Sequence, residues 1–155
     1  MAGFSATAVA EQTVNPGESV VFTASVNHLR NFVSFNNETG ATLLSGNVPS
    51  VPAGCPCCAD RTVDYPVAFG ANIAIPDGQT VGEISVAFSV DGVTDPASVM
   101  RTVPTAVAQY QNVCRVKNVG VWKQCGCQRV SVRNISNIPI LVKEATLDID
   151  GLAFA

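Results

Sequence analysis

The stretch from Val63 to Ile75, VDYPVAFGANIAI, constrains the fold of this chain more than any other segment. Every odd position in it is apolar, and the even positions carry small or polar residues. Successive side chains of a β-strand point to opposite faces, so this period of two predicts a strand with one face in a core. A helix would need apolar spacings of three and four, and Pro66 and Gly70 would break it.

The even face of the same strand consists of small residues. Its members are Asp64, Pro66, Ala68, Gly70, Asn72 and Ala74. Small side chains let another backbone approach closely, so Ala68, Gly70 and Asn72 are the candidate contact residues for a neighbouring subunit. Because proline cannot donate to a ladder, we expect Pro66 at an edge or a bulge.

Similar alternation recurs along the chain, with turn residues between the alternating segments. Further strands are expected within 20–26, 31–37, 42–44, 84–90, 106–122, 130–132 and from 140 onward. Pro76-Asp77-Gly78 and Asp91-Gly92 are hairpin-type turn signals. The apolar phase slips near Lys143-Glu144, which predicts a β-bulge there.

Helical periodicity is absent from the sequence over any run of ten or more residues, as judged from the pattern of about 3.6 residues per turn. The expected fold class is therefore an all-β jelly-roll sandwich of about eight to ten antiparallel strands. Residues 1–12 are expected to form an N-terminal arm or an edge strand, and residues 13–155 a single jelly-roll domain.

The composition suggests a surface that is partly covered by a partner. Apolar residues make up 47% of the 155 residues and charged residues only 14%, against about a quarter in ordinary domains. Low charge together with high apolar content argues against disorder and favours an oligomer. The formal net charge of −3 makes nucleic acid an unfavourable partner.

Two further classes of role are not expected from the sequence. No apolar run approaches the roughly 20 residues of a membrane-spanning helix. The start, MAGFSATAVAEQ, has no cationic region and no sustained apolar run, so we expect no signal peptide and synthesis in the cytosol.

Arg115 and Lys117 alternate on one expected strand face, which is typical of a solvated face and less often of a phosphate-binding stripe.

The six cysteines allow three interpretations: disulfides, a zinc site, or free thiols. They are Cys55, Cys57, Cys58, Cys114, Cys125 and Cys127. An even number permits full pairing, within or between subunits. Zinc could be bound by Cys55, Cys57, Cys125 and Cys127, although the C-x-C spacing is poorer than the usual C-x₂₋₄-C. Cys114 lies in an expected strand, where a free thiol is often part of the core.

No catalytic constellation accompanies these features. His28 is the single histidine, and no nucleophile motif is present for it to activate. Asp148 and Asp150 share a strand face, which is more typical of solvation than of calcium binding. Tyr65, Tyr110 and Trp122 could form a sugar-stacking surface, but core or interface positions are the more usual account. We therefore expect the chain to have no enzyme activity and to bind no cofactor.

The segment Tyr65–Gly92, YPVAFGANIAIPDGQTVGEISVAFSVDG, resembles the trimeric jelly-roll heads related to tumour necrosis factor and the complement globular head. Pro104–Val107, the cysteine-bearing turn at Cys125–Cys127 and the segment Val130–Leu147 are also similar to that family. In particular, the chain resembles the bacterial version found at the C-terminus of collagen-like spore-surface proteins and in phage virion proteins of Firmicutes.

The resemblance implies a homotrimer with a tapered apolar interface and no enzyme activity. The sequence carries no Gly-X-Y stalk, which favours a compact piece of a larger particle. The primary hypothesis is a structural virion protein of a bacteriophage: a capsid decoration, head-fibre or tail-tip trimer located in the virion. The alternatives are an adhesion module that binds a host-surface receptor or glycan through loops 45–60 and 91–104, and a disulfide-crosslinked spore-surface or appendage subunit.

Overall fold

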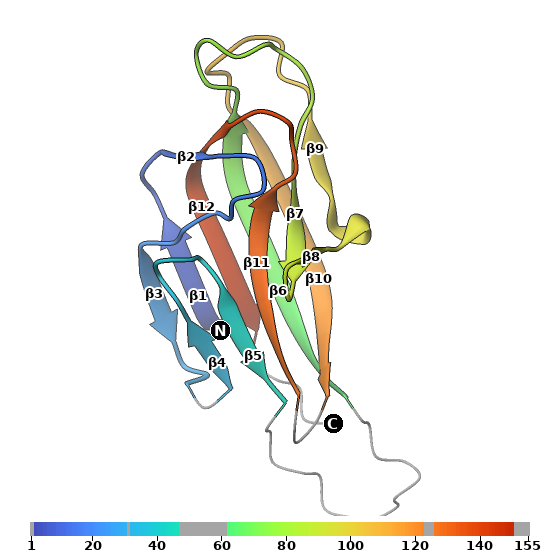
Figure 1. The fold of residues 1–155 in the computed structure, drawn as a ribbon. Helices are drawn as coiled ribbons and strands as arrows, with labels where there is room; N and C mark the ends of the chain where they lie inside the picture. The colour runs from blue at the N-terminus through green and yellow to red at the C-terminus, as the bar shows by residue number, and fades with distance from the viewer. Residues whose placement is uncertain (1, 31, 47–61, 123–125, 151–155) are drawn as a thin grey trace, which may run out of the picture.

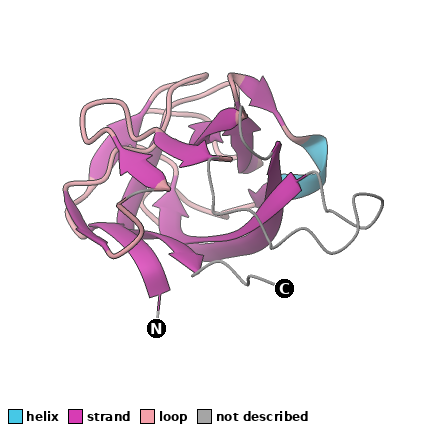
Figure 2. Cartoon of the chain, turned by 90° about the horizontal axis from the view of Figure 1, so that it is seen from below, coloured by secondary structure: helices cyan, strands magenta, loops and turns pink. Residues whose placement is uncertain are grey.

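Two antiparallel β-sheets face each other across an apolar core in the computed structural model, which describes residues 2–30, 32–46, 62–122 and 126–150 (Figures 1 and 2). This arrangement confirms the predicted all-β jelly-roll sandwich. The described residues form twelve strands, and the additional ones, β2, β8 and β9, are only two or three residues long.

Sheet A is the longer layer. In spatial order it contains β10 (Gln111–Trp122), β6 (Thr62–Ala74), β12 (Ile140–Asp150), β1 (Ala2–Ala8) and β3 (Ala24–Asn27), and β2 (Gln12–Val14) also pairs with β12. Sheet B contains β4 (Val33–Phe35), β5 (Thr42–Ser45), β11 (Cys127–Asn134), β7 (Ile84–Val90) and β8 (Val93–Thr94), and β9 (Met100–Thr102) also pairs with β7. Among the described residues, the helical structure is one short 3₁₀ turn, η1 (Pro96–Ser98), and no helix there is long and apolar enough to span a membrane.

Strand β6 confirms the alternation that the sequence predicts. Its odd positions and the residue after it are all at most 9% exposed: Val63, Tyr65, Val67, Phe69, Ala71, Ile73 and Ile75. Pro66 meets the expectation of an edge position on one side of β6, although the strand lies between β10 and β12 and its register with β10 has no shift. The ladder with β12 ends at Val67, so Pro66 lies beyond the last pair on that side. A proline is tolerated there because no β12 residue pairs with it.

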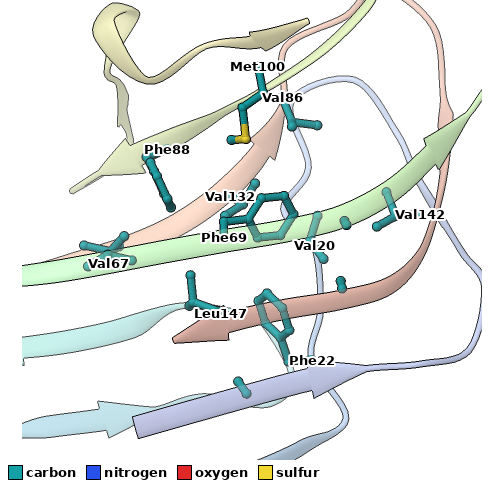
Figure 3. Close-up of a cluster of buried hydrophobic side chains, with 14 of the residues drawn as sticks. Val20, Phe22, Val67, Phe69, Val86, Phe88, Met100, Val132, Val142 and Leu147 are labelled. Atoms are coloured by element: carbon teal, nitrogen blue, oxygen red, sulfur yellow. The ribbon is translucent and has the colours of Figure 1, made fainter. Parts of the chain in front are cut away.

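Aromatic side chains join the two sheets through the core (Figure 3). Phe69 of β6 packs edge-on against Phe22 and against Phe88 of β7, with ring centroids 6.5 Å apart in both pairs. Such edge-to-face geometry is favoured by the ring quadrupole and adds to the burial of large apolar surface. Phe69 therefore links elements of both sheets.

The N-terminal part of the chain departs from expectation in two places. Residues 2–8 form an internal strand, β1, between β12 and β3, and not an arm or an edge strand. The expected strand at 20–26 is divided, because the chain crosses there between the sheets. Val20 donates to the Val132 carbonyl of sheet B, whereas Thr23 donates to the Thr7 carbonyl of sheet A.

The two predicted turns have different roles. Asp91 and Gly92, with φ of 51° and 83°, join β7 to β8 as a two-residue hairpin in which Val90 pairs with Val93. Positive φ at both central residues is the geometry that such hairpins favour. Pro76-Asp77-Gly78 is a turn but not a hairpin, because β6 belongs to sheet A and β7 to sheet B. Turn residues alone do not distinguish these two cases.

The predicted bulge at Lys143-Glu144 is confirmed. The register of β12 with β6 shifts between Lys143 and Thr146, and Glu144 has a φ of 52°. The Glu144 carboxylate accepts a hydrogen bond from the Asn72 amide at 2.7 Å. This contact helps to hold a backbone conformation that residues other than glycine adopt only at a cost in free energy.

Ala108 provides a test of backbone strain. It is exposed, has a φ of 57° and donates its N–H to the Ile75 carbonyl. Because a Cβ is disfavoured in this region, Ala108→Gly should raise the free energy of unfolding by about 0.5–1 kcal/mol, as measured by urea denaturation. Ala106→Gly, at an exposed neighbour without positive φ, should have no stabilising effect. Equal effects of the two substitutions would contradict the strain at Ala108.

Candidate functional site

The outer face of sheet A, called here the flat face, is the first candidate site. Two rows of paired residues cross all five main strands. One row contains Val26, Ser5, Asp148, Ala68 and Val116. The other contains Ala24, Thr7, Thr146, Gly70 and Cys114.

Small and uncharged side chains dominate these rows. Of the ten residues, Asp148 alone carries a formal charge. Val26 and Val116, at opposite ends of their row, are 58% and 67% exposed, although valine is usually buried. The predicted interface residues Ala68, Gly70 and Asn72 lie together on this face and are half-buried. A wide surface of small side chains that carries little charge and leaves two valines exposed is typical of a face that another protein covers.

A groove on the other side of the sandwich is the second candidate site. It has a volume of about 800 Å³ and lies across the outer face of sheet B at the β4–β5 turn. A row of paired residues, Ser34, Leu43 and Arg129, forms part of its lining. Turn residues 36–39 form one wall.

The groove wall is held by a network of backbone bonds. Asn36 exchanges hydrogen bonds with the chain on the far side of the turn, through the Ala41 carbonyl and the Gly40 N–H. Its side-chain oxygen accepts from the N–H groups of Glu38 and Thr39 at 2.9 and 3.3 Å. Gly40 has a φ of 70°, and a Cβ at this position would lie 2.0 Å from the Val20 carbonyl oxygen. The turn therefore packs closely on the crossing segment and is restrained from both sides.

Solved structures with this arrangement include two animal proteins. The globular domain of the zebrafish complement 1qA protein is 14% identical, with a TM-score of 0.61 over 96% of this chain and 95% of that chain. The Eiger TNF of S. frugiperda is 9% identical, with a TM-score of 0.61 over 98% of this chain and 93% of that chain. The chain has the jelly-roll fold of the complement and TNF heads. No family model and no curated protein matches its sequence.

The cysteines of this jelly-roll head are only partly within the described residues. Cys114 and Cys127 are free and exposed, so the expectation that Cys114 belongs to the core is wrong. Cys114 lies on the flat face because it pairs with Gly70 and not with a buried residue of β6. Cys55, Cys57, Cys58 and Cys125 lie outside the described residues, so the zinc and disulfide interpretations stay predictions. The described part of the chain contains no cluster of residues that could hold a metal ion.

Arg115 and Lys117 share one face of β10, as expected; Arg115 is exposed and Lys117 half-buried, and both contact the protein itself. They pair with Phe69 and Val67 and so lie on the face of β10 opposite the flat face. The Arg115 guanidinium donates to the Ala97 carbonyl at 2.6 Å, and Lys117 Nζ lies 2.5 Å from an Asp95 carboxylate oxygen. Together they fasten the segment around η1 to the edge strand of sheet A.

This ion pair predicts a pH effect on stability. The hydrogen bond from Lys117, together with the one from the Ala97 N–H, holds the pKa of Asp95 below its ordinary value. Such a carboxylate stabilises the folded state above its unfolded pKa, and the contribution is lost as the pH falls through the folded pKa. Asp95→Asn should therefore reduce the fall in stability between about pH 5 and pH 3. The change should be below about 1 kcal/mol, because the pair is partly exposed.

Urea midpoints at neutral and acidic pH measure this effect. Asp77→Asn, at an exposed turn, is the matched control and should leave the pH profile as in the wild type. An unchanged acid sensitivity in Asp95→Asn would show that the Lys117 contact contributes nothing to stability.

The aromatic residues and His28 do not form a common site. Tyr65 is fully buried, its hydroxyl donates to the Ser45 carbonyl, and burial raises its pKa to about 12. Tyr110 precedes the start of β10 and donates to Glu11, whereas Trp122 ends β10 and is 58% exposed. The sugar-stacking surface is therefore not formed. His28 is exposed beside the β3–β4 connection, and its backbone N–H donates to the Gly3 carbonyl.

Sequence reasoning found the flat face but missed the groove. The small even positions of β6 already point to the flat face. The groove brings together a turn at residues 36–39 and Arg129, which are far apart in the sequence. The sequence indicates the turn through Asn36-Asn37 and Gly40, but nothing in it indicates that β5 and β11 pair there.

Proposed function

We propose that this chain is the subunit of a homotrimeric jelly-roll head that works by assembly and binding and not by catalysis. The flat face carries the proposal. It extends across the five main strands of sheet A, it is built from small side chains, and it leaves Val26 and Val116 largely exposed in the single chain. Covering these valines with a second copy would remove apolar surface from water, and the small neighbours would let the two backbones approach.

The likeness to the complement and TNF heads supports three copies, because the sequence resemblance to that family implies a trimer. The test is the mass in solution, by light scattering after size exclusion or by native mass spectrometry. We expect three times the chain mass of 16.1 kDa. A stable monomer at micromolar concentration would exclude the proposal. A dimer would be compatible with the flat face as an interface but would exclude the threefold arrangement.

The more specific role that we propose is structural, as part of a bacteriophage particle. The low share of charged residues, 14%, and the similarity of Tyr65–Gly92 to phage virion proteins support it. The sites in question are a capsid decoration, a head fibre or a tail tip. Mass spectrometry of purified phage particles should find the chain at a fixed ratio to the capsid protein. The same resemblance includes spore-surface proteins, and detection only on purified spores would favour that alternative.

A second candidate function is a receptor-binding module, and the groove on sheet B favours it. The groove lies on the face opposite the flat face, so any assembly that covers sheet A and leaves the outer face of sheet B uncovered would keep the groove of every copy open. Binding sites on a rigid β scaffold are commonly built from loops and turns. A glycan array probed with the trimer should give specific hits if this function is correct, and an array with no hits would leave the structural role.

A further inference from the structure

The groove at the β4–β5 turn contains a cation without a partner. The Arg129 side chain is exposed, and its guanidinium makes no hydrogen bond or ion pair with the described residues. Its backbone is engaged with Asp91, because the Arg129 N–H donates to the Asp91 carboxylate and the Arg129 carbonyl accepts from the Asp91 N–H, both at 2.8 Å. Arg115 and Lys117, by contrast, are engaged by other groups of the described residues. Arg129 is therefore available to an anion from outside.

The remainder of the lining combines apolar and polar groups. Leu43 is half-buried and lies between Ser34 and Arg129 in the cross-strand row. The opposite wall presents the side chains of Asn37, Glu38 and Thr39. Hydroxyl, amide and carboxylate groups thus surround a small apolar floor. Sugars present the complementary surface, because their C–H groups are apolar and their hydroxyls both donate and accept hydrogen bonds.

We propose that this groove binds an anionic saccharide, with the sugar carboxylate held by Arg129 and the hydroxyls by the wall at residues 36–39. A guanidinium can hold a carboxylate through two parallel N–H···O bonds, which provides both strength and orientation. Glu38 accepts hydrogen bonds from sugar hydroxyls, but it would repel a ligand with many negative charges. The lining therefore fits a sugar acid with one carboxylate per unit better than it fits an acidic peptide.

The groove wall is held in place by contacts within the chain itself. The bonds from Asn36 and the close packing of Gly40 on Val20 hold the turn in place. A site that needs little ordering on binding loses less free energy to conformational entropy. This inference deepens the binding role proposed above, but it concerns each chain separately and does not depend on the trimer.

The test uses the whole 155-residue chain and saturation-transfer difference NMR. Sodium glucuronate and N-acetylneuraminate are the probes, and glucose is the neutral control. We expect both acids to bind about tenfold or more tightly than glucose. Arg129→Gln should remove that difference. The matched control is Arg101→Gln, which changes the same charge at an exposed position on β9 and should bind as the wild type does.

Three results would overturn the inference: acid binding that survives Arg129→Gln, acids that bind no better than glucose, or no signal from either acid at about 10 mM. Arg129-dependent binding of a glutamate-rich peptide that exceeds that of both sugars would assign the groove to an acidic peptide instead. The mass of Arg129→Gln in solution is measured in parallel. A monomeric wild type would exclude the trimer without affecting the saccharide result, so the two proposals fail separately.

Discussion

Ala68→Lys should convert the proposed trimer to a monomer while leaving the fold of the chain intact. Ala68 lies near the centre of the flat face, between Asp148 and Val116 in the cross-strand row. A lysine there would place a long charged side chain where a second copy must approach closely. The main cost is steric, because the Asp148 carboxylate lies directly across the ladder and can pair with the ammonium, whereas the extra side-chain volume holds the second copy away.

Light scattering should report a fall from three times 16.1 kDa to the mass of one chain, with an unchanged far-ultraviolet circular dichroism spectrum. Val93→Lys is the matched control, since Val93 is 71% exposed on β8 in the other sheet and should leave the mass unchanged. If Ala68→Lys assembles normally, the flat face faces solvent and the trimer uses another surface. If both substitutions dissociate the protein, the effect is one of charge and not of position.

Phe69→Ala should lower the free energy of unfolding by about 3–5 kcal/mol. The side chain is 2% exposed, and its ring contacts both Phe22 and Phe88. Alanine would leave a cavity between the sheets, and the surrounding strands cannot collapse into it because both sheets hold their register through long ladders. The total stability of a domain is about 5–15 kcal/mol, so much of it would be lost.

Guanidinium denaturation at one fixed protein concentration measures this loss, because the stability of an oligomer depends on concentration. Val93→Ala, which removes apolar atoms from an exposed position, should change the free energy by less than about 0.5 kcal/mol. A similarly small effect of Phe69→Ala would mean that the rings of Phe22, Phe69 and Phe88 are not tightly packed in the core.

The sequence predicts the flat face and most long strands because both depend on local alternation. In β6 the period of two determines which residues are buried, and the phase slip at Lys143-Glu144 marks the bulge. Pairing between distant strands leaves no such local pattern. The crossing of the chain between the sheets at residues 20–26, the internal position of β1 and the ion pair between Lys117 and Asp95 all depend on which strands become neighbours, and alternation does not determine this.

The groove shows the same limit. From the sequence alone, Arg129 cannot be distinguished from any other exposed cation, and residues 36–39 cannot be distinguished from any other turn. Only the register of β5 with β11 brings them to one place. The composition shows only that the chain has few charged residues. The structure distinguishes two surfaces that this low charge does not: the flat face on sheet A and the polar groove on sheet B.

The position of β12 in sheet A has a consequence for biosynthesis. This strand joins β6 and β10 to β1 and β3, yet it comes from residues 140–150, after every other described strand in the chain. A nascent chain that has emerged only as far as Asn134 therefore lacks the strand that unites the two halves of sheet A. The flat face cannot exist until that strand is inserted, so chains that have not yet produced β12 cannot associate through it.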